Sequence, residues 1–106
     1  MSENWQLTSE EKKIVGTYER KSGANTFRYV LLDNRQAEDY SNEHKSVDNS
    51  IWSIVGQKVH IEATQERFIA VFSINADGNL NSIANIIDGI RRDFTKEQQT
   101  TYKKIK

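Results

Sequence analysis

Two adjacent arginines, Arg91 and Arg92, are the residues that first suggest binding chemistry in this sequence. They follow Asp88-Gly89, a pair that favours the tight turn of a β-hairpin, and they belong to its return strand. Successive side chains of a strand point to opposite faces, so at most one of the two arginines faces a core. If Ile90 faces inward, Arg92 shares its face and Arg91 points outward.

The pair is compatible with three roles. An inward guanidinium must be paired or stacked, because an unpaired buried charge is strongly destabilising. Its plane stacks well on aromatic rings, which makes Arg92 a candidate for a structural lid over the end of a core. The alternatives are that both arginines are solvated or that they bind an anion.

Other residues with catalytic or metal-binding chemistry form no recognisable site. His44 lies in a polar stretch, and His60 alternates with Val59 and Ile61, which places it on the opposite, outer face. The chain has no cysteine, shows no metal-ligand spacing and contains no nucleophile or phosphate-binding fingerprint. We therefore expect no metal, no cofactor and no enzymatic activity.

Length and charge narrow the function classes further. The 106 residues fit one domain, 1–106, and the 15 Lys and Arg balance the 15 Asp and Glu, without the basic excess of a nucleic-acid binder. No stretch is apolar enough to span a membrane. The N-terminus resembles no signal peptide, so the chain is cytoplasmic if complete and extracytoplasmic if a leader was removed.

Short β-rich segments separated by Gly, Asn and Asp corners predict an all-β fold. Proline is absent. Capping-box patterns at 8–11 and 95–98 predict two short helical turns. The expected strands are 13–20, 26–33, 36–40, 51–55, 58–63, 67–74, 79–87, 90–94 and 100–105.

Period-two alternation and short loops favour one particular all-β architecture. Phe27, Tyr29 and Leu31 share a face, as do Phe68 and Phe72. Strands joined by short loops pair with their sequence neighbours, and closing the sheet removes its exposed edges. We predict a small antiparallel up-and-down β-barrel of about eight strands with a short N-terminal helical turn; the alternative is a two-sheet β-sandwich.

The segment "LTSEEKKIVGTYE", with Gly16 and Tyr18, resembles the start of the calycins, the lipocalin and fatty-acid-binding-protein superfamily. In that superfamily a helical turn precedes a strand with Gly-x-Trp, and an arginine or lysine near the last strand packs across the aromatic ring. The resemblance, shared with small bacterial lipocalin-like domains, implies a single barrel domain whose lid comprises Gly16, Tyr18 and Arg92.

An eight-stranded barrel is either filled by its own side chains or holds one small ligand. The many large apolar residues favour a filled interior, with a small pocket as the alternative. We expect a non-enzymatic binding module for a small hydrophobic or amphipathic molecule, with Tyr29, Trp52 and Phe72 as pocket residues. The alternative is a protein-interaction or inhibitor domain acting through loops such as 41–50. Trp5 is expected to clamp the N-terminal turn over the barrel, or else to mark a contact surface.

Overall fold

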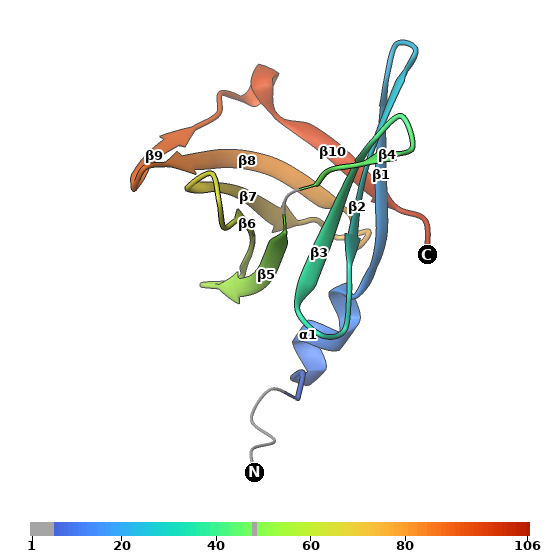
Figure 1. Cartoon of the computed structure of the whole chain (residues 1–106), viewed down its shortest axis with the longest axis vertical. Helices are drawn as coiled ribbons and strands as arrows, with labels where there is room; N and C mark the ends of the chain where they lie inside the picture. Colours follow the sequence, from blue (N-terminus) through green and yellow to red (C-terminus); the bar gives the residue numbers. More distant parts are fainter. Residues whose placement is uncertain (1–5, 48) are drawn as a thin grey trace.

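A closed antiparallel β-barrel forms the body of the protein in a computed structural model, which describes residues 6–47 and 49–106 (Figure 1). The expectation for Trp5 lies outside the described residues. The elements are α1 (Ser9–Ile14), β1 (Gly16–Ser22), β2 (Asn25–Leu31), β3 (Gln36–Ser41), β4 (His44–Lys45), β5 (Ser50–Val55), β6 (Lys58–Ala63), β7 (Phe68–Ile74), β8 (Leu80–Ile87), β9 (Ile90–Asp93), the 3-10 turn η1 (Lys96–Gln98) and β10 (Thr100–Lys104).

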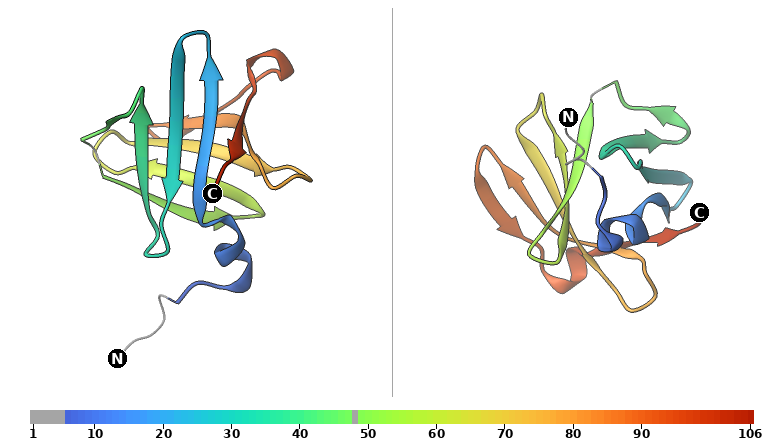
Figure 2. Two further views of the ribbon diagram at one scale, coloured as in Figure 1. Left: turned by 90° about the vertical axis from the view of Figure 1, so that its right-hand side faces the viewer. Right: turned by 90° about the horizontal axis from the view of Figure 1, so that it is seen from below.

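Eight of these strands make the ring, in the order β10-β1-β2-β3-β5-β6-β7-β8, and β10 also pairs with β8 to close it. The predicted barrel is therefore confirmed, and the sandwich alternative is not adopted. Two short strands lie outside the ring: β4 pairs with β3, and β9 extends the sheet from β8. Figure 2 shows α1 against one end of the barrel. We call this the closed end and the opposite end the mouth.

The inward face of the barrel follows the predicted alternation. Tyr18 of β1 is paired with Tyr29 of β2, which is paired with Asp39 of β3, and on the other side Val59 is paired with Phe72. Because directly paired residues share a face of the sheet, these side chains all point into the barrel. The buried core comprises Ile14, Tyr18, Leu31, Ala37, Trp52, Val59, Ile61, Ala70, Phe72, Leu80 and Tyr102.

Helix α1 begins at a complete capping box. The Thr8 amide donates to Glu11 Oε1 at 2.8 Å, and the Glu11 amide donates to Thr8 Oγ1 at 3.1 Å, which satisfies two otherwise orphaned donors. The helix continues to Ile14, so β1 begins at Gly16 and not at residue 13 as predicted. The second predicted turn also forms, with the Thr95 amide donating to Gln98 Oε1 at 3.0 Å.

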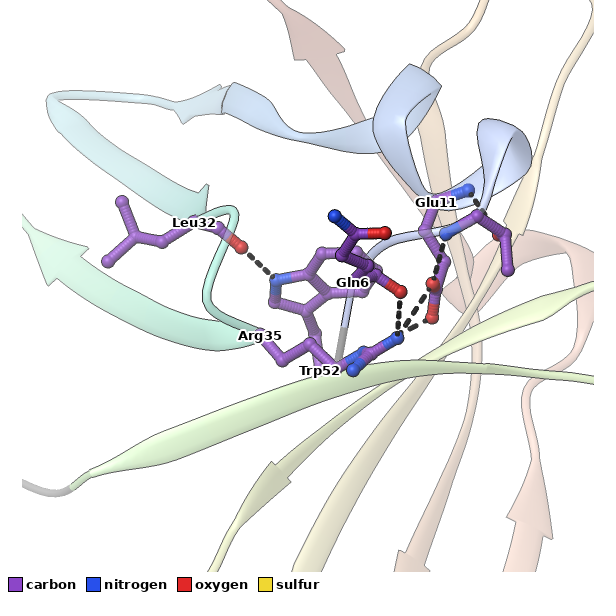
Figure 3. A network of polar contacts seen from close by, with 6 residues as sticks. Gln6, Glu11, Leu32, Arg35 and Trp52 are labelled. Atoms are coloured by element: carbon purple, nitrogen blue, oxygen red, sulfur yellow. Dashed lines mark hydrogen bonds and ion pairs between the residues drawn. The ribbon is translucent and has the colours of Figure 1, made fainter. Parts of the chain in front are cut away.

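A polar network fixes α1 to the barrel (Figure 3). The Arg35 guanidinium, from the β2–β3 turn, contacts Glu11 with Nη2–Oε1 and Nε–Oε2 distances of 2.8 and 3.3 Å. Beneath it, Trp52 Nε1 donates to the Leu32 carbonyl at 2.8 Å, and the Trp52 amide donates to the Arg35 carbonyl. One turn thus joins α1, β5 and the largest core side chain.

Replacing Glu11 by Gln tests this anchor through pH. The hydrogen bond from Arg35, followed by that from the Thr8 amide, holds the pKa of Glu11 below its ordinary value of 4.5. A carboxyl whose pKa is lowered by folding stabilises the protein above its unfolded-state pKa, and this contribution disappears as the pH falls through the folded-state pKa. We expect Glu11→Gln to lower the free energy of unfolding by about 1 kcal/mol at neutral pH and to flatten its decline below about pH 5. Urea titrations at several pH values measure both effects. The exposed neighbour variant Glu10→Gln is the control, and an identical pH profile for the wild type and Glu11→Gln would refute the anchor.

Candidate functional site

The closed end is built around Tyr18, whose side chain is completely buried. Its hydroxyl donates to the Ile14 carbonyl at 2.7 Å and so caps the last turn of α1. Burial raises the pKa of Tyr18 to about 12, so the phenol stays protonated and keeps this donor at physiological pH. A buried, hydrogen-bonded tyrosine of this kind holds structure together and is not available to a ligand.

The cation over this ring is Lys104, in the last strand. Its Nζ lies 5.8 Å from the Tyr18 ring centroid and donates to the Lys13 carbonyl at 2.6 Å. Gly16 lets the chain end approach, because a Cβ at this position would collide with the Lys106 carbonyl oxygen and would lie 2.8 Å from Lys104 Cε. The lid therefore consists of Gly16, Tyr18 and Lys104.

The predicted role of Arg92 in this lid is corrected by the structure. Arg92 is exposed in β9, where it is paired with Asn85, and β9 has no pairing with β1. Arg91 points outward and forms an ion pair within β9, with its Nε 2.9 Å from Asp93 Oδ1. The cation in contact with Tyr18 comes from β10, where Lys104 is the residue paired directly with Tyr18.

Two of the three predicted pocket residues belong to the core. Trp52 and Phe72 are each 1% exposed. Phe72 packs against Tyr29 and Tyr102 with ring centroids 5.5 and 5.9 Å away, and the Tyr29–Tyr102 centroids are 5.2 Å apart. This aromatic triad packs inside the barrel and joins β2, β7 and β10. Tyr29, the third predicted residue, also lines a cavity.

That cavity, which we call the mouth cavity, has a volume of about 130 Å³ and lies on the mouth side of the triad. Its apolar wall comes from β2, β6 and β7, and its polar wall comes from β3, the start of β5, and single residues that follow β4 and β6. The lining residues are Tyr29, Ile61, Ala63, Phe68 and Ala70 on the apolar side and Asp39, Ser46, Ser50 and Glu66 on the polar side.

The charge environment at this end is mixed. Burial, followed by the neighbouring Tyr102 and Asp39, raises the pKa of Tyr29, and Arg20 partly opposes this rise. The Arg20 guanidinium lies 4.6 Å from the Phe27 ring centroid and 5.4 Å from that of Tyr102. Its buried Nε has no hydrogen-bond partner among the described residues. Sequence reasoning missed Arg20, although the even spacing of Tyr18 and Arg20 in β1 places both on the inner face.

The described residues offer no other obvious chemistry. Across residues 6–47 and 49–106, no three His, Asp or Glu side chains are grouped so as to hold a metal ion. His60 is partly buried, and desolvation, followed by the charge of Arg91, lowers its pKa. His44, expected in a loop, lies in the short strand β4. Within the described part of the chain, no helix has the length and hydrophobicity needed to cross a bilayer. No family model matches the sequence, and no curated protein or solved structure matches it significantly.

Substitution of the two candidate lid cations separates the prediction from the structure. We expect Lys104→Ala to lower the free energy of unfolding by about 1 kcal/mol, because it removes a cation–π contact and a charged hydrogen bond. Arg92→Ala, at an exposed position of an edge strand, should change it by less than about 0.5 kcal/mol. Chemical denaturation of both variants measures the difference. A larger loss for Arg92→Ala than for Lys104→Ala would contradict the assignment of the lid.

Proposed function

We propose that the protein is a non-enzymatic binding module that holds a small amphipathic molecule in the mouth cavity. The observation that carries this proposal is the cavity itself, which is lined by side chains of five ring strands, β2, β3, β5, β6 and β7, at the end opposite the lid. Ligand sites are typically concave and largely apolar, with a few polar groups that fix orientation. The mouth cavity is concave, and its lining is about equally polar and apolar, which suits an amphipathic molecule.

The volume limits the size of the ligand. An apolar protein cavity of about 150 Å³ accommodates a molecule such as benzene, and the mouth cavity has about 130 Å³. The aromatic triad prevents a longer chain from passing down the barrel axis. The ligand is therefore a compact molecule, or the compact end of a larger one whose remainder stays outside the mouth.

The two walls set its chemistry. An aromatic or branched aliphatic part fits against Tyr29, Phe68 and Ala70, which line the apolar side of the cavity. The polar wall contains Asp39 and Glu66, which as carboxylates only accept hydrogen bonds. A polar end that donates hydrogen bonds, such as an alcohol or an amine, is compatible with these acceptors, which also interact within the protein.

The architecture also supports a calycin-like assignment, which we include in the proposal. The barrel has a helical turn before its first strand, a Gly-x-aromatic pair in Gly16 and Tyr18, and a cation from its last strand, Lys104, over that ring. Tyr18 in place of tryptophan is a variation on the pattern, whereas a lysine such as Lys104 belongs to it. A calycin-like relationship is in keeping with a non-enzymatic binding role.

A second candidate function, protein interaction through residues 41–50, is favoured by one residue. Val47 is 95% exposed in the connection between β4 and β5, and an isolated apolar side chain at such a position suits contact with a partner. Replacement of Val47 by Ser should leave small-ligand binding unchanged and weaken a partner complex, so the two functions can be separated.

The mouth cavity is tested by titrating the protein with phenol, benzyl alcohol and benzylamine and following methyl NMR signals. We expect saturable shifts of the Ala63 and Ala70 methyls, because both line the cavity. Trp52 fluorescence should respond weakly, since this residue packs at the closed end. Affinities should be modest, with a Kd of about 0.1–10 mM for ligands of this size.

Ala63→Leu supplies the matched test, because the larger side chain fills the cavity from the inner face of β6. It should abolish the saturable shift of the Ala70 methyl. Ser53→Leu adds the same side chain on the exposed outer face of β5 and should leave binding intact. Linear, unsaturable shifts in the wild type, or unchanged binding by Ala63→Leu, would rule out the mouth cavity as the site.

A further inference from the structure

A second concave region lies outside the barrel interior, at the closed end. We call it the basal groove: it runs between α1, the β5–β6 turn at Gln57 and the β7–β8 turn at residues 75–78, with a volume of about 570 Å³. Ligand pockets of drug-sized molecules occupy about 300–1,000 Å³. The basal groove falls in this range, and it shares no lining residue with the mouth cavity.

Its floor is apolar and consists of three isoleucines from different elements. Ile14 ends α1, Ile54 comes from β5, and Ile74 ends β7. Ile74 is 39% exposed although it faces the same side of β7 as Phe72, which is buried. A partly exposed apolar side chain at the edge of the core leaves hydrocarbon surface that a ligand can cover.

The walls of the groove are preorganised. In the β7–β8 turn, Asn75 Oδ1 accepts hydrogen bonds from the amides of Asp77 and Asn79 at 2.9 and 3.0 Å, which fixes the turn without a ligand. On the other side, α1 is held by its capping box and by the contact of Glu11 with Arg35. Rigid walls lower the ordering cost of binding.

The groove is lined by two acidic and two basic residues, and Lys104 is the least exposed of the four. Of its charged lining residues, Glu10, Lys13 and Asp77 are exposed, whereas Lys104 is half-buried. Charges in contact with bulk water are strongly screened, and a half-buried charge is screened less. The Lys104 ammonium is also held in place by the Lys13 carbonyl, which uses one of its three N–H donors.

We propose that the basal groove binds an anionic amphiphile, with its hydrocarbon part on Ile14, Ile54 and Ile74 and its anionic group at the Lys104 ammonium. The site is independent of the mouth cavity. The lysine of the lid thereby has two roles: it covers the Tyr18 ring on one side and presents a fixed cation to the groove on the other.

Three probes with the same chain and different head groups test this proposal on the unmodified protein: octanoate, octanol and octylammonium, each below its micelle concentration. Isoleucine δ1 methyl NMR signals report the basal groove, and the Ala63 and Ala70 methyls report the mouth cavity. We expect octanoate to shift the signals of Ile14, Ile54 and Ile74 saturably and to bind about fivefold or more tightly than octanol. Tighter binding of octanol or octylammonium would overturn the role of Lys104, and unshifted isoleucines would overturn the site. Both outcomes concern the basal groove alone, because the Ala63 and Ala70 signals report the mouth cavity separately.

Variants then assign the contribution of each part. Lys104→Gln retains a donor for the Lys13 carbonyl. It should reduce the affinity for octanoate to that for octanol and leave the affinity for octanol unchanged. Lys103→Gln removes one positive charge from the exposed outer face of β10 and should change the affinity for neither octanoate nor octanol. Ile74→Gln, at a partly exposed position that tolerates a polar side chain, should weaken both probes. An unchanged preference for octanoate in folded Lys104→Gln would refute the proposal.

Discussion

The rest of the structure depends on one constraint, the double pairing of β10. This five-residue strand is paired with β8 through Thr100, Thr101 and Tyr102, and with β1 through Lys103 and Lys104. Closure pairs every ring strand with a neighbour on both edges, so the ring has no free edge strand within the described residues. This backbone pairing supports a chain whose apolar content is modest. It also sets the two ends of the molecule, because a single strand delivers Tyr102 to the aromatic triad and Lys104 to the ring of Tyr18.

Both candidate sites follow from the way this closure fills the barrel. The inward positions of β1, β2, β7 and β10 supply Tyr18, Tyr29, Phe72 and Tyr102, and four rings are enough to block the axis of so small a barrel. What remains is a shallow cavity on one side and an external groove on the other. Composition alone does not decide whether the barrel interior is filled or hollow. In the structure, side chains fill the centre, and a small cavity remains at the mouth.

The sequence predicted the features that depend on local patterns. Period-two alternation gave the inward faces of β2 and β7, and the capping boxes gave both helical turns. It failed where pairing departs from regular alternation. A bulge opposite Val71 and Phe72 shifts the register of β8, so that Ser82 is paired with the inward Phe72 and Asn85 with the inward Ala70, while Ile86 is paired with Ile69 on the outer face. Pairing of β9 with β8 alone likewise excludes Arg92 from the lid, and no local pattern encodes that partner choice.

The same distinction explains which site residues could be found. Tyr18 and Gly16 lie in a short motif, and their roles at the closed end can be inferred from it. Lys104 is one of three lysines near the C-terminus, and only its register opposite Tyr18 selects it over Lys103. Arg20 carries a signal in its even spacing from Tyr18, but a lone arginine on an amphipathic strand is easily read as solvated. In a closed barrel the chemistry of a cation is therefore decided by strand register, since a shift of one residue in β10 would place Lys103 over the ring and remove the fixed ammonium from the groove.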